Sequence, residues 1–130
     1  MPHILLIEDE DFIRDVYKEE LELVGLPTDA FASGDEGIRA INKKIYDLVL
    51  LDIILPDTNG LDVLKQIKQN PKTKDIPVVL LTNLDQDVII KQGLKFGAVG
   101  YLIKASFTPG QVAQEVKNIL SHQEAERLKS

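Results

Sequence analysis

Short apolar runs alternate with segments of helical periodicity along the chain. Three runs are wholly apolar, at residues 4–7, 48–51 and 78–81, and a fourth at 99–103 is nearly so. Continuous apolar runs of this length are typical of parallel strands that helices cover on both faces. Residues 28–32 mix Thr, Asp and Ala with Phe, so they predict a fifth strand at the edge of the sheet.

Between the predicted strands, apolar residues recur three or four positions apart, which is the spacing of one helix face. The five helical segments carry these residues in chain order: Ile13, Val16, Tyr17, Leu21 and Val24; Ile38, Ile41 and Ile45; Leu61, Leu64 and Ile67; Ile89, Ile90 and Leu94; and Val112, Val116, Ile119 and Leu120. Ser33 with Glu36, and Thr108 with Gln111, have the spacing of capping boxes. Asp85 is the predicted cap of the fourth helix.

Five strand–helix units in succession predict a flavodoxin-like (βα)5 fold. In this α/β architecture a doubly wound parallel five-stranded sheet lies between two helical layers, and its connections are right-handed. A polar edge strand that is second in sequence favours the strand order 2-1-3-4-5. We expect one domain over residues 1–121, with residues 122–130 forming the end of the last helix or the start of a linker.

Polar side chains follow the buried strands at the point where each strand ends. Glu8 and Asp9 follow the first strand, Asp52 the third, Thr82 the fourth and Lys104 the fifth. The carboxyl ends of parallel strands share one edge, where ligands bind near the junction of strands 1 and 3. Three ionised carboxylates there would raise a pKa or recruit a cation, and hard oxygen ligands favour Mg²⁺. With Lys104 and Thr82 placed to contact an anion, the set is typical of phosphoryl transfer to a carboxylate.

Four segments at this edge match a known family in order and spacing. They are ILLIEDED at residues 4–11, LVLLDIILPDTNG at 48–60, PVVLLTN at 77–83 and GAVGYLIKASFTP at 97–109. On these segments the chain resembles the receiver domain of bacterial two-component response regulators, up to about residue 121. Any one segment alone is a weak signal, whereas the four together are specific.

The resemblance implies a role for each residue at the edge. Asp52 would be the phosphoacceptor and would also contact the metal, and Asp9 would be a direct Mg²⁺ ligand. Glu8 would assist the metal through water, and the main-chain carbonyl of Ile54 would be a further ligand. Lys104 would neutralise the phosphoryl group.

The resemblance also implies a conformational switch, and the sequence departs from the family pattern near it. Thr82 would bond to the phosphoryl group and move inward on activation, with Tyr101 as its aromatic partner. Asn83 stands where the family usually has a small residue. The bulky apolar Ile54 is expected to limit water near the acyl phosphate and lengthen its lifetime. Ala105 replaces a proline that often follows the lysine through a cis bond, and the sequence leaves open whether this bond is cis or trans.

By this resemblance the chain is a signalling switch rather than an enzyme that acts on other substrates. A histidine kinase or a histidine phosphotransfer protein would donate the phosphoryl group. The domain would catalyse only its own phosphorylation and dephosphorylation. The downstream partner would be another protein or an output domain removed from this chain. Isolated receivers are often monomers, so we expect a monomer or a weak phosphorylation-dependent dimer.

Composition and charge narrow the function classes further. The net charge of −6 argues against direct binding of nucleic acid. No apolar run reaches the length of a membrane span, and the first residues do not resemble a signal peptide. The chain has no cysteine, which fits the cytosol. We therefore expect a cytoplasmic protein without membrane contact.

The same residues bear on three other classes of protein. Aspartyl-phosphate hydrolases of the haloacid dehalogenase type need a second Asp two residues after the nucleophile, where this chain has Ile54. A flavodoxin-like mononucleotide binder needs Gly, Ser or Thr in its first loop, which here holds four acids. A phosphorylation-independent pseudo-receiver scaffold is the main alternative, although such domains typically lack one key residue and Asp9, Asp52, Thr82 and Lys104 are all present.

Overall fold

A computed structural model describes residues 2–83 and 87–129 of the chain. Strands and helices alternate along it, as the sequence predicts. Their bounds are β1 Ile4–Ile7, α1 Asp11–Leu23, β2 Thr28–Phe31, α2 Gly34–Lys43, β3 Leu48–Asp52, α3 Gly60–Gln69, β4 Val78–Thr82, α4 Asp87–Lys95, β5 Gly100–Ile103, a 3-10 helix Lys104–Ser106 and α5 Pro109–Lys129.

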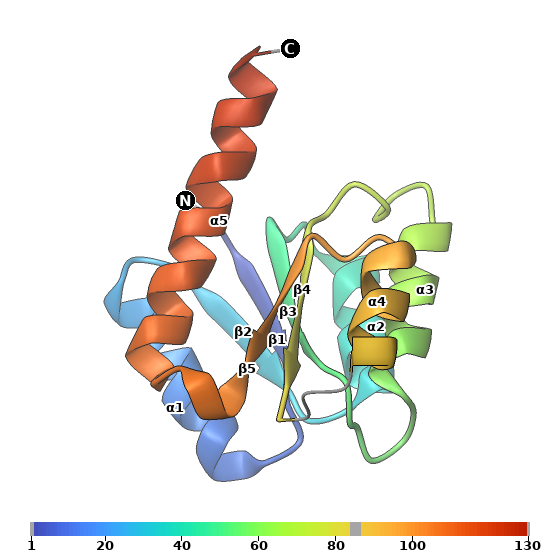
Figure 1. The fold of residues 1–130 in the computed structure, drawn as a ribbon, viewed down its shortest axis with the longest axis horizontal. Helices are drawn as coiled ribbons and strands as arrows, with labels where there is room; N and C mark the ends of the chain where they lie inside the picture. The colour runs from blue at the N-terminus through green and yellow to red at the C-terminus, as the bar shows by residue number, and fades with distance from the viewer. Residues whose placement is uncertain (1, 84–86, 130) are drawn as a thin grey trace.

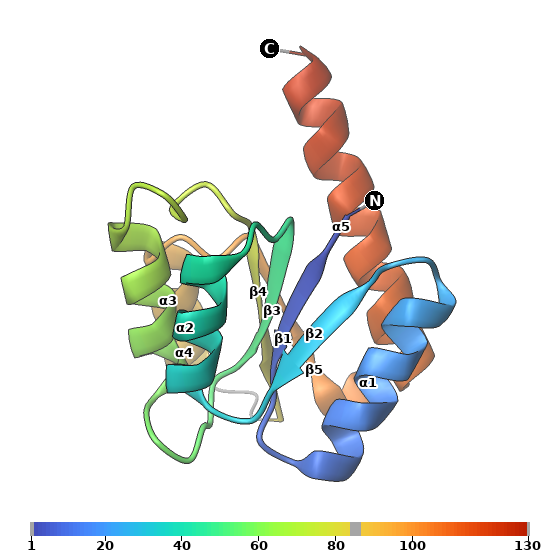
Figure 2. The same cartoon turned by 180° about the vertical axis from the view of Figure 1, so that it is seen from behind.

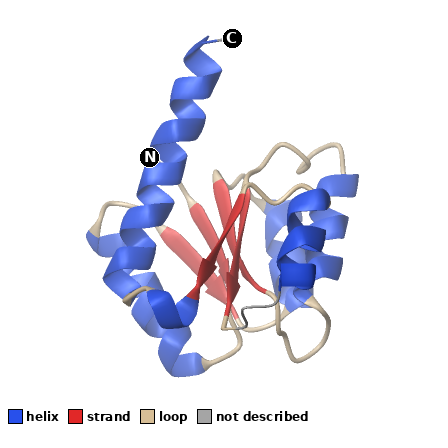
Figure 3. Ribbon diagram, in the orientation of Figure 1, coloured by secondary structure: helices blue, strands red, loops and turns tan. Residues whose placement is uncertain are grey.

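The strands form one parallel sheet between two layers of helices. Its order is β2-β1-β3-β4-β5, which confirms the predicted flavodoxin-like topology. In Figure 1, α1 and α5 cover one face of the sheet and α2, α3 and α4 cover the other, and Figure 2 shows the same layers from behind. All strands run in the same direction in Figure 3, so their carboxyl ends meet at the lower edge of that view.

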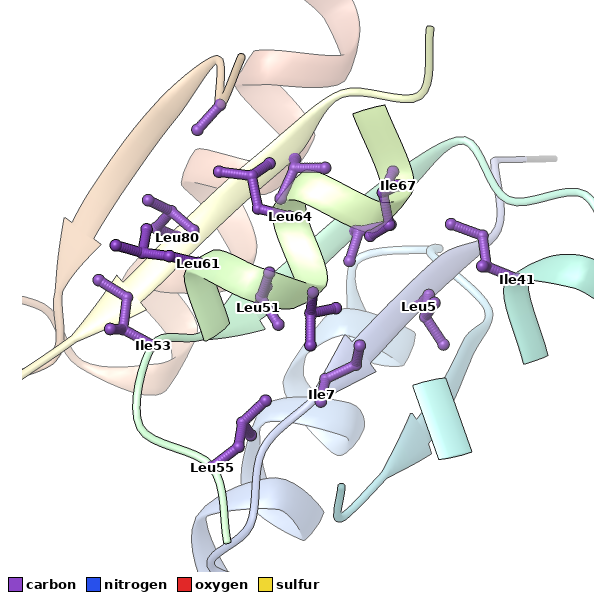
Figure 4. Packing of buried hydrophobic residues seen from close by; sticks show 14 of the residues in the cluster. Leu5, Ile7, Ile41, Leu51, Ile53, Leu55, Leu61, Leu64, Ile67 and Leu80 are labelled. Carbon is purple, nitrogen blue, oxygen red and sulfur yellow. The ribbon is translucent and has the colours of Figure 1, made fainter. Parts of the chain in front are cut away.

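The three central strands β1, β3 and β4 are buried on both faces of the sheet, which explains their continuous apolar runs. Leu5 and Ile7 of β1 pack with α2 and α3, whereas Ile4 and Leu6 pack with α1 and α5, because successive strand side chains point to opposite faces. Figure 4 shows the cluster on the α2 and α3 side. Full burial of each aliphatic side chain contributes roughly 1.5–3 kcal/mol, so the two clusters hold the helices on the sheet.

One of the predicted capping boxes forms completely and the other forms in part. Thr108 Oγ1 accepts the N–H of Gln111 at 3.1 Å, and Gln111 Oε1 accepts the N–H of Thr108 at 2.8 Å. Ser33 Oγ accepts the N–H of Glu36 at 3.2 Å, but the Glu36 carboxylate accepts from the Ser33 hydroxyl rather than from its N–H. The predicted cap at Asp85 lies outside the described residues.

Several boundaries differ from the sequence expectation, most clearly at Ile45 and Val99. The apolar pattern places Ile45 on the buried face of the second helix, which is wrong. Lys44 takes an extended conformation that ends α2 at Lys43, and Ile45 is 87% exposed. Val99 precedes β5 instead of opening it. The bond between Lys104 and Ala105 is trans, since the described residues contain no cis peptide bond.

Helix α5 continues without a break from Pro109 to Lys129. Its last turns extend beyond the sheet in Figure 1. Residues 122–129 therefore continue the last helix, while the domain boundary at residue 121 stays a prediction. Within the described residues, no helix combines the length and apolar character that a membrane span requires.

Asp57 joins the loop after β3 to the start of α2. Its Oδ1 accepts the N–H of Gly34, and its Oδ2 accepts the N–H of Asp35, both at 2.9 Å. The bond from Gly34 and then that from Asp35 lower the pKa of Asp57, because they favour the charged form. The carboxylate thus satisfies two amides that the helix itself leaves without partners.

Replacing Asp57 with Asn is expected to lower the free energy of unfolding by about 1 kcal/mol, because the amide has one acceptor oxygen and so loses one of the two hydrogen bonds. Urea unfolding measures the loss, with the exposed Asp15→Asn as the control. Since the folded pKa of Asp57 is lowered, its contribution is present above the ordinary carboxyl pKa and disappears as the pH falls through the lowered value. The gap between wild type and variant should therefore shrink below about pH 4, and an undiminished gap there would contradict this account.

Candidate functional site

The polar residues that follow the strands meet at the carboxyl edge of the sheet. Ile7 of β1 is level with Leu51 of β3, so the next residues, Glu8 and Asp52, come side by side. Thr82 ends β4, the neighbouring strand on the other side of β3. Because a buried strand interior is wholly apolar here, its end is the first place where a polar side chain can turn toward solvent or a ligand.

Lys104 bridges two buried carboxylates at this edge. Its Nζ lies 2.8 Å from Oδ2 of Asp52 and also contacts Oε1 of Glu8. The side chains of Lys104, Asp52 and Glu8 are 8%, 7% and 0% exposed. Burial by itself lowers the pKa of Lys104, but the bonds with Asp52 and Glu8 outweigh it and raise the pKa. The lysine is therefore a fixed positive charge beside both carboxylates.

Glu8 is fully buried, and its pKa is raised to about 7. Burial is the largest cause, and the nearby charge of Asp52 acts in the same direction. Lys104 opposes the shift, as does the N–H of Glu10, which donates to Oε2 of Glu8 at 3.1 Å. Because burial is the largest cause, the raised pKa marks Glu8 as a carboxyl group held away from water beside Asp52 and Lys104.

Glu8, Asp9 and Asp52 form a cluster that we call the acidic triad, and it could hold a metal ion. One carboxylate oxygen from each residue lies within 4.8 Å of the others. Hard carboxylate oxygens are the protein ligands that Mg²⁺ prefers, and Mg²⁺ keeps several waters, so few protein ligands suffice. The donor set of the acidic triad therefore fits Mg²⁺.

Ile54 lies beside the acidic triad on the loop that follows β3. Its N–H donates to Oδ1 of Asp52 at 3.1 Å, which fixes the orientation of that carboxylate. Its side chain is 57% exposed and lines a pocket of about 320 Å³, together with Asn59, Thr82 and Ile89. The assignment of its main-chain carbonyl as a metal ligand stays a prediction.

Thr82 and Tyr101 lie on neighbouring strands and on one face of the sheet. Thr82 is buried and is level with Ile103 of β5, so strand alternation puts Tyr101 on the same face as Thr82. Tyr101 is 43% exposed, and Asn83 is exposed just beyond β4. Thr82 and Tyr101 are therefore close in the fold, while their role as a switch stays a prediction.

Sequence reasoning missed three residues that shape the edge: Arg14, Asp57 and Gly60. A Cβ at Gly60 would lie 2.6 Å from Cα and 2.9 Å from O of Ile53, so only glycine lets α3 start against β3. The PDTNG turn was the available signal for Gly60. The signal for Arg14 was its position three residues after a run of four acids, within the first turn of the predicted helix.

Fold and site together define a flavodoxin-like domain with an acidic, lysine-bridged site at the carboxyl edge of its sheet. The chain is similar to the CheY-like receiver domain protein of Methanospirillum hungatei, with a TM-score of 0.88 and 27% identity over 97% of this chain and 98% of that one. Residues 4–117 match the family model described as the response regulator receiver domain. The chain belongs to this family, the receiver domains of two-component response regulators.

Curated relatives agree with this assignment. The phosphate regulon transcriptional regulatory protein PhoB of Rhizobium meliloti is 30% identical over 128 residues, which cover 98% of this chain and 56% of PhoB. The transcriptional regulatory protein AfsQ1 of Streptomyces coelicolor is 36% identical over 104 residues, covering 80% of this chain and 45% of AfsQ1. The chain thus spans about half the length of the curated relatives that it matches.

Proposed function

We propose that this receiver domain is phosphorylated on Asp52 in a Mg²⁺-dependent reaction and acts as a conformational signalling switch. The observation that carries the proposal is the buried Asp52 carboxylate, which bonds to Lys104 and lies beside the other members of the acidic triad. The donor is a phosphohistidine on a histidine kinase or on a histidine phosphotransfer protein. Cytoplasmic location and a monomer or weak phosphorylation-dependent dimer are part of the same proposal.

In the proposed transfer, a carboxylate oxygen of Asp52 attacks the phosphorus atom as the P–N bond of the phosphohistidine breaks. The imidazole leaves and takes up a proton from solvent, so charge and atoms balance. Lys104 offsets the charge added to Asp52, since its Nζ already bonds to that carboxylate. Mg²⁺, held by the acidic triad and the main-chain carbonyl of Ile54, would neutralise charge on the phosphoryl oxygens.

The phosphoryl group would then act through Thr82 and Tyr101. A hydrogen bond from the Thr82 hydroxyl to the phosphoryl group draws Thr82 inward and frees space for Tyr101, which biases the packing of α4, β5 and α5. The domain catalyses only its own phosphorylation and dephosphorylation. Its signal passes to a downstream protein or to an output domain in a longer chain. A phosphorylation-independent scaffold is disfavoured, because the acidic triad, Lys104 and Thr82 occur together at one edge.

Reductive trapping tests which residue accepts the phosphoryl group. After incubation with acetyl phosphate and Mg²⁺, borohydride reduces an aspartyl phosphate to homoserine, and peptide mass spectrometry locates the change. Homoserine is expected at residue 52. Homoserine at Asp9 or at Asp57 instead would overturn the proposed acceptor.

Replacing Ile54 with Asn is expected to shorten the lifetime of the phosphorylated domain by about fivefold, which corresponds to roughly 1 kcal/mol of barrier. A polar side chain at position 54, in the pocket that Ile54 and Thr82 line and two residues from Asp52, would bind and orient water that an isoleucine excludes. Loss of the phosphoryl mass with time measures the lifetime after acetyl phosphate is removed. Ile45→Asn makes the same change at an exposed position away from the site and should leave the lifetime unchanged. Equal lifetimes for Ile54→Asn and wild type would refute the shielding role.

A further inference from the structure

The guanidinium of Arg14 in α1 contacts the main chain of the loop that carries Glu8 and Asp9, two members of the acidic triad. Its Nη1 donates to the main-chain carbonyl of Glu8 at 3.0 Å and to that of Asp9 at 3.3 Å. Its Nη2 donates to Oδ1 of Asp11 at 2.6 Å. The Arg14 side chain is only 18% exposed, so the guanidinium is part of the loop structure rather than a free surface charge.

The Glu8 end of the loop is also held by its own N–H, which donates to the carbonyl of Phe31 at 3.0 Å, and by Lys104, whereas the start of α1 contributes less. Glu10 occupies the N-cap position of α1, and its side chain makes no capping hydrogen bond. Consecutive acids at residues 8–11 repel one another and favour splayed conformations. Arg14 bonds to the carbonyls of the two residues whose carboxylates face Asp52. Both carbonyls accept from Nη1 while Nη2 bonds to Asp11, so the rigid fork of the guanidinium fixes where Nη1 points.

We infer that Arg14 is a positioning residue for the cation site, which holds the Glu8–Asp9 main chain in the conformation that points both carboxylates toward Asp52. This inference rests on the proposed function, since it concerns the Mg²⁺ that the acidic triad would bind. It assigns the effect to the fork geometry of Arg14 and not to its charge.

The sign of the effect separates positioning from electrostatics. A positive charge near a cation site opposes cation binding, so loss of that charge would by itself strengthen Mg²⁺ binding. Loss of a group that orients metal ligands weakens binding, typically by 10–100-fold. The ion pair between Arg14 and Asp11 is too exposed to decide the outcome, because Asp11 is 88% exposed.

Mg²⁺ titration of the whole chain tests the inference. The backbone amide shifts of Glu10 and Ile54 report binding in wild type, Arg14→Lys and Arg14→Gln. Both variants are expected to bind Mg²⁺ about tenfold or more weakly, because lysine keeps the charge but lacks the fork and glutamine lacks both. Arg39→Lys and Arg39→Gln make the same changes at an exposed position of α2 and should change affinity by less than about twofold.

Each outcome decides a different point. Wild-type affinity in Arg14→Lys, or tighter binding in Arg14→Gln, would overturn the positioning role while leaving the proposed function intact. A wild-type chain that binds no Mg²⁺ would overturn the proposed function and this inference with it. Urea unfolding establishes that each variant is folded under the titration conditions. If Arg14→Gln is unfolded, Arg14→Lys decides alone, since it preserves the charge.

Discussion

Replacing Lys104 with Met is expected to lower the free energy of unfolding of the metal-free domain by about 3 kcal/mol, because two buried carboxylates lose their shared cation. Asp52 and Glu8 are almost fully buried and both bond to Nζ of Lys104. Methionine has a similar length and no charge, so the change isolates the loss of the ion pairs. Urea unfolding in the presence of a metal chelator measures it.

The same variant should also accept the phosphoryl group about 100-fold more slowly, as expected when one donor to a developing anion is removed. The rate of mass gain with acetyl phosphate gives this value. Lys91→Met makes the same substitution at an exposed position of α4 and should leave stability and rate near wild type. A Lys104→Met protein as stable as Lys91→Met would contradict the ion-pair account.

Replacing Gly60 with Ala is expected to destabilise the domain by about 3 kcal/mol through overpacking. The added Cβ would meet main-chain atoms of Asp52 and Ile53, including Cα of Ile53 at 2.6 Å. The carbonyl of Asp52 at the end of β3 and the main chain of Ile53 just beyond it cannot swing away as the end of a flexible side chain can. The strand must shift, and Asp52 shifts with it, so the rate of phosphorylation should fall together with the stability.

Gly100→Ala provides the matched control. A Cβ at Gly100 of β5 would have no atom within 4 Å, so the same substitution there should change the free energy of unfolding by about 0.5 kcal/mol or less. Urea unfolding of both variants gives the comparison. Similar stabilities for the two variants would show that α3 can move off β3 at little cost.

The sheet was predictable from the sequence because burial on both faces leaves a simple signature. Runs of apolar residues, such as 4–7 and 48–51, match β1 and most of β3. The mixed composition of residues 28–32 identified β2 as an edge strand, and that fixed the strand order. Ile45 was placed wrongly because its spacing continues the pattern of α2, while the extended conformation of Lys44 sends the chain toward β3.

The sequence predicts which polar side chains gather at the edge, but it does not predict their contacts or the structural parts of Arg14, Asp57 and Gly60. Strand ends identified Glu8, Asp52 and Lys104, because parallel topology puts them at one edge. That Lys104 bonds to Glu8 as well as to Asp52 depends on side-chain packing, which no spacing rule supplies. Asp57 caps a helix more than twenty residues away in sequence, so local capping rules could not find it.

Intact-mass spectrometry after incubation with acetyl phosphate tests the central claim most directly. The wild-type chain and Asp52→Asn are compared, each with Mg²⁺ and with a metal chelator. We expect one added phosphoryl group on the wild-type chain with Mg²⁺, and none in the other three samples. An adduct that forms on Asp52→Asn, or equally without Mg²⁺, would contradict the claim, as would a folded wild-type chain that accepts no phosphoryl group from acetyl phosphate or phosphoramidate.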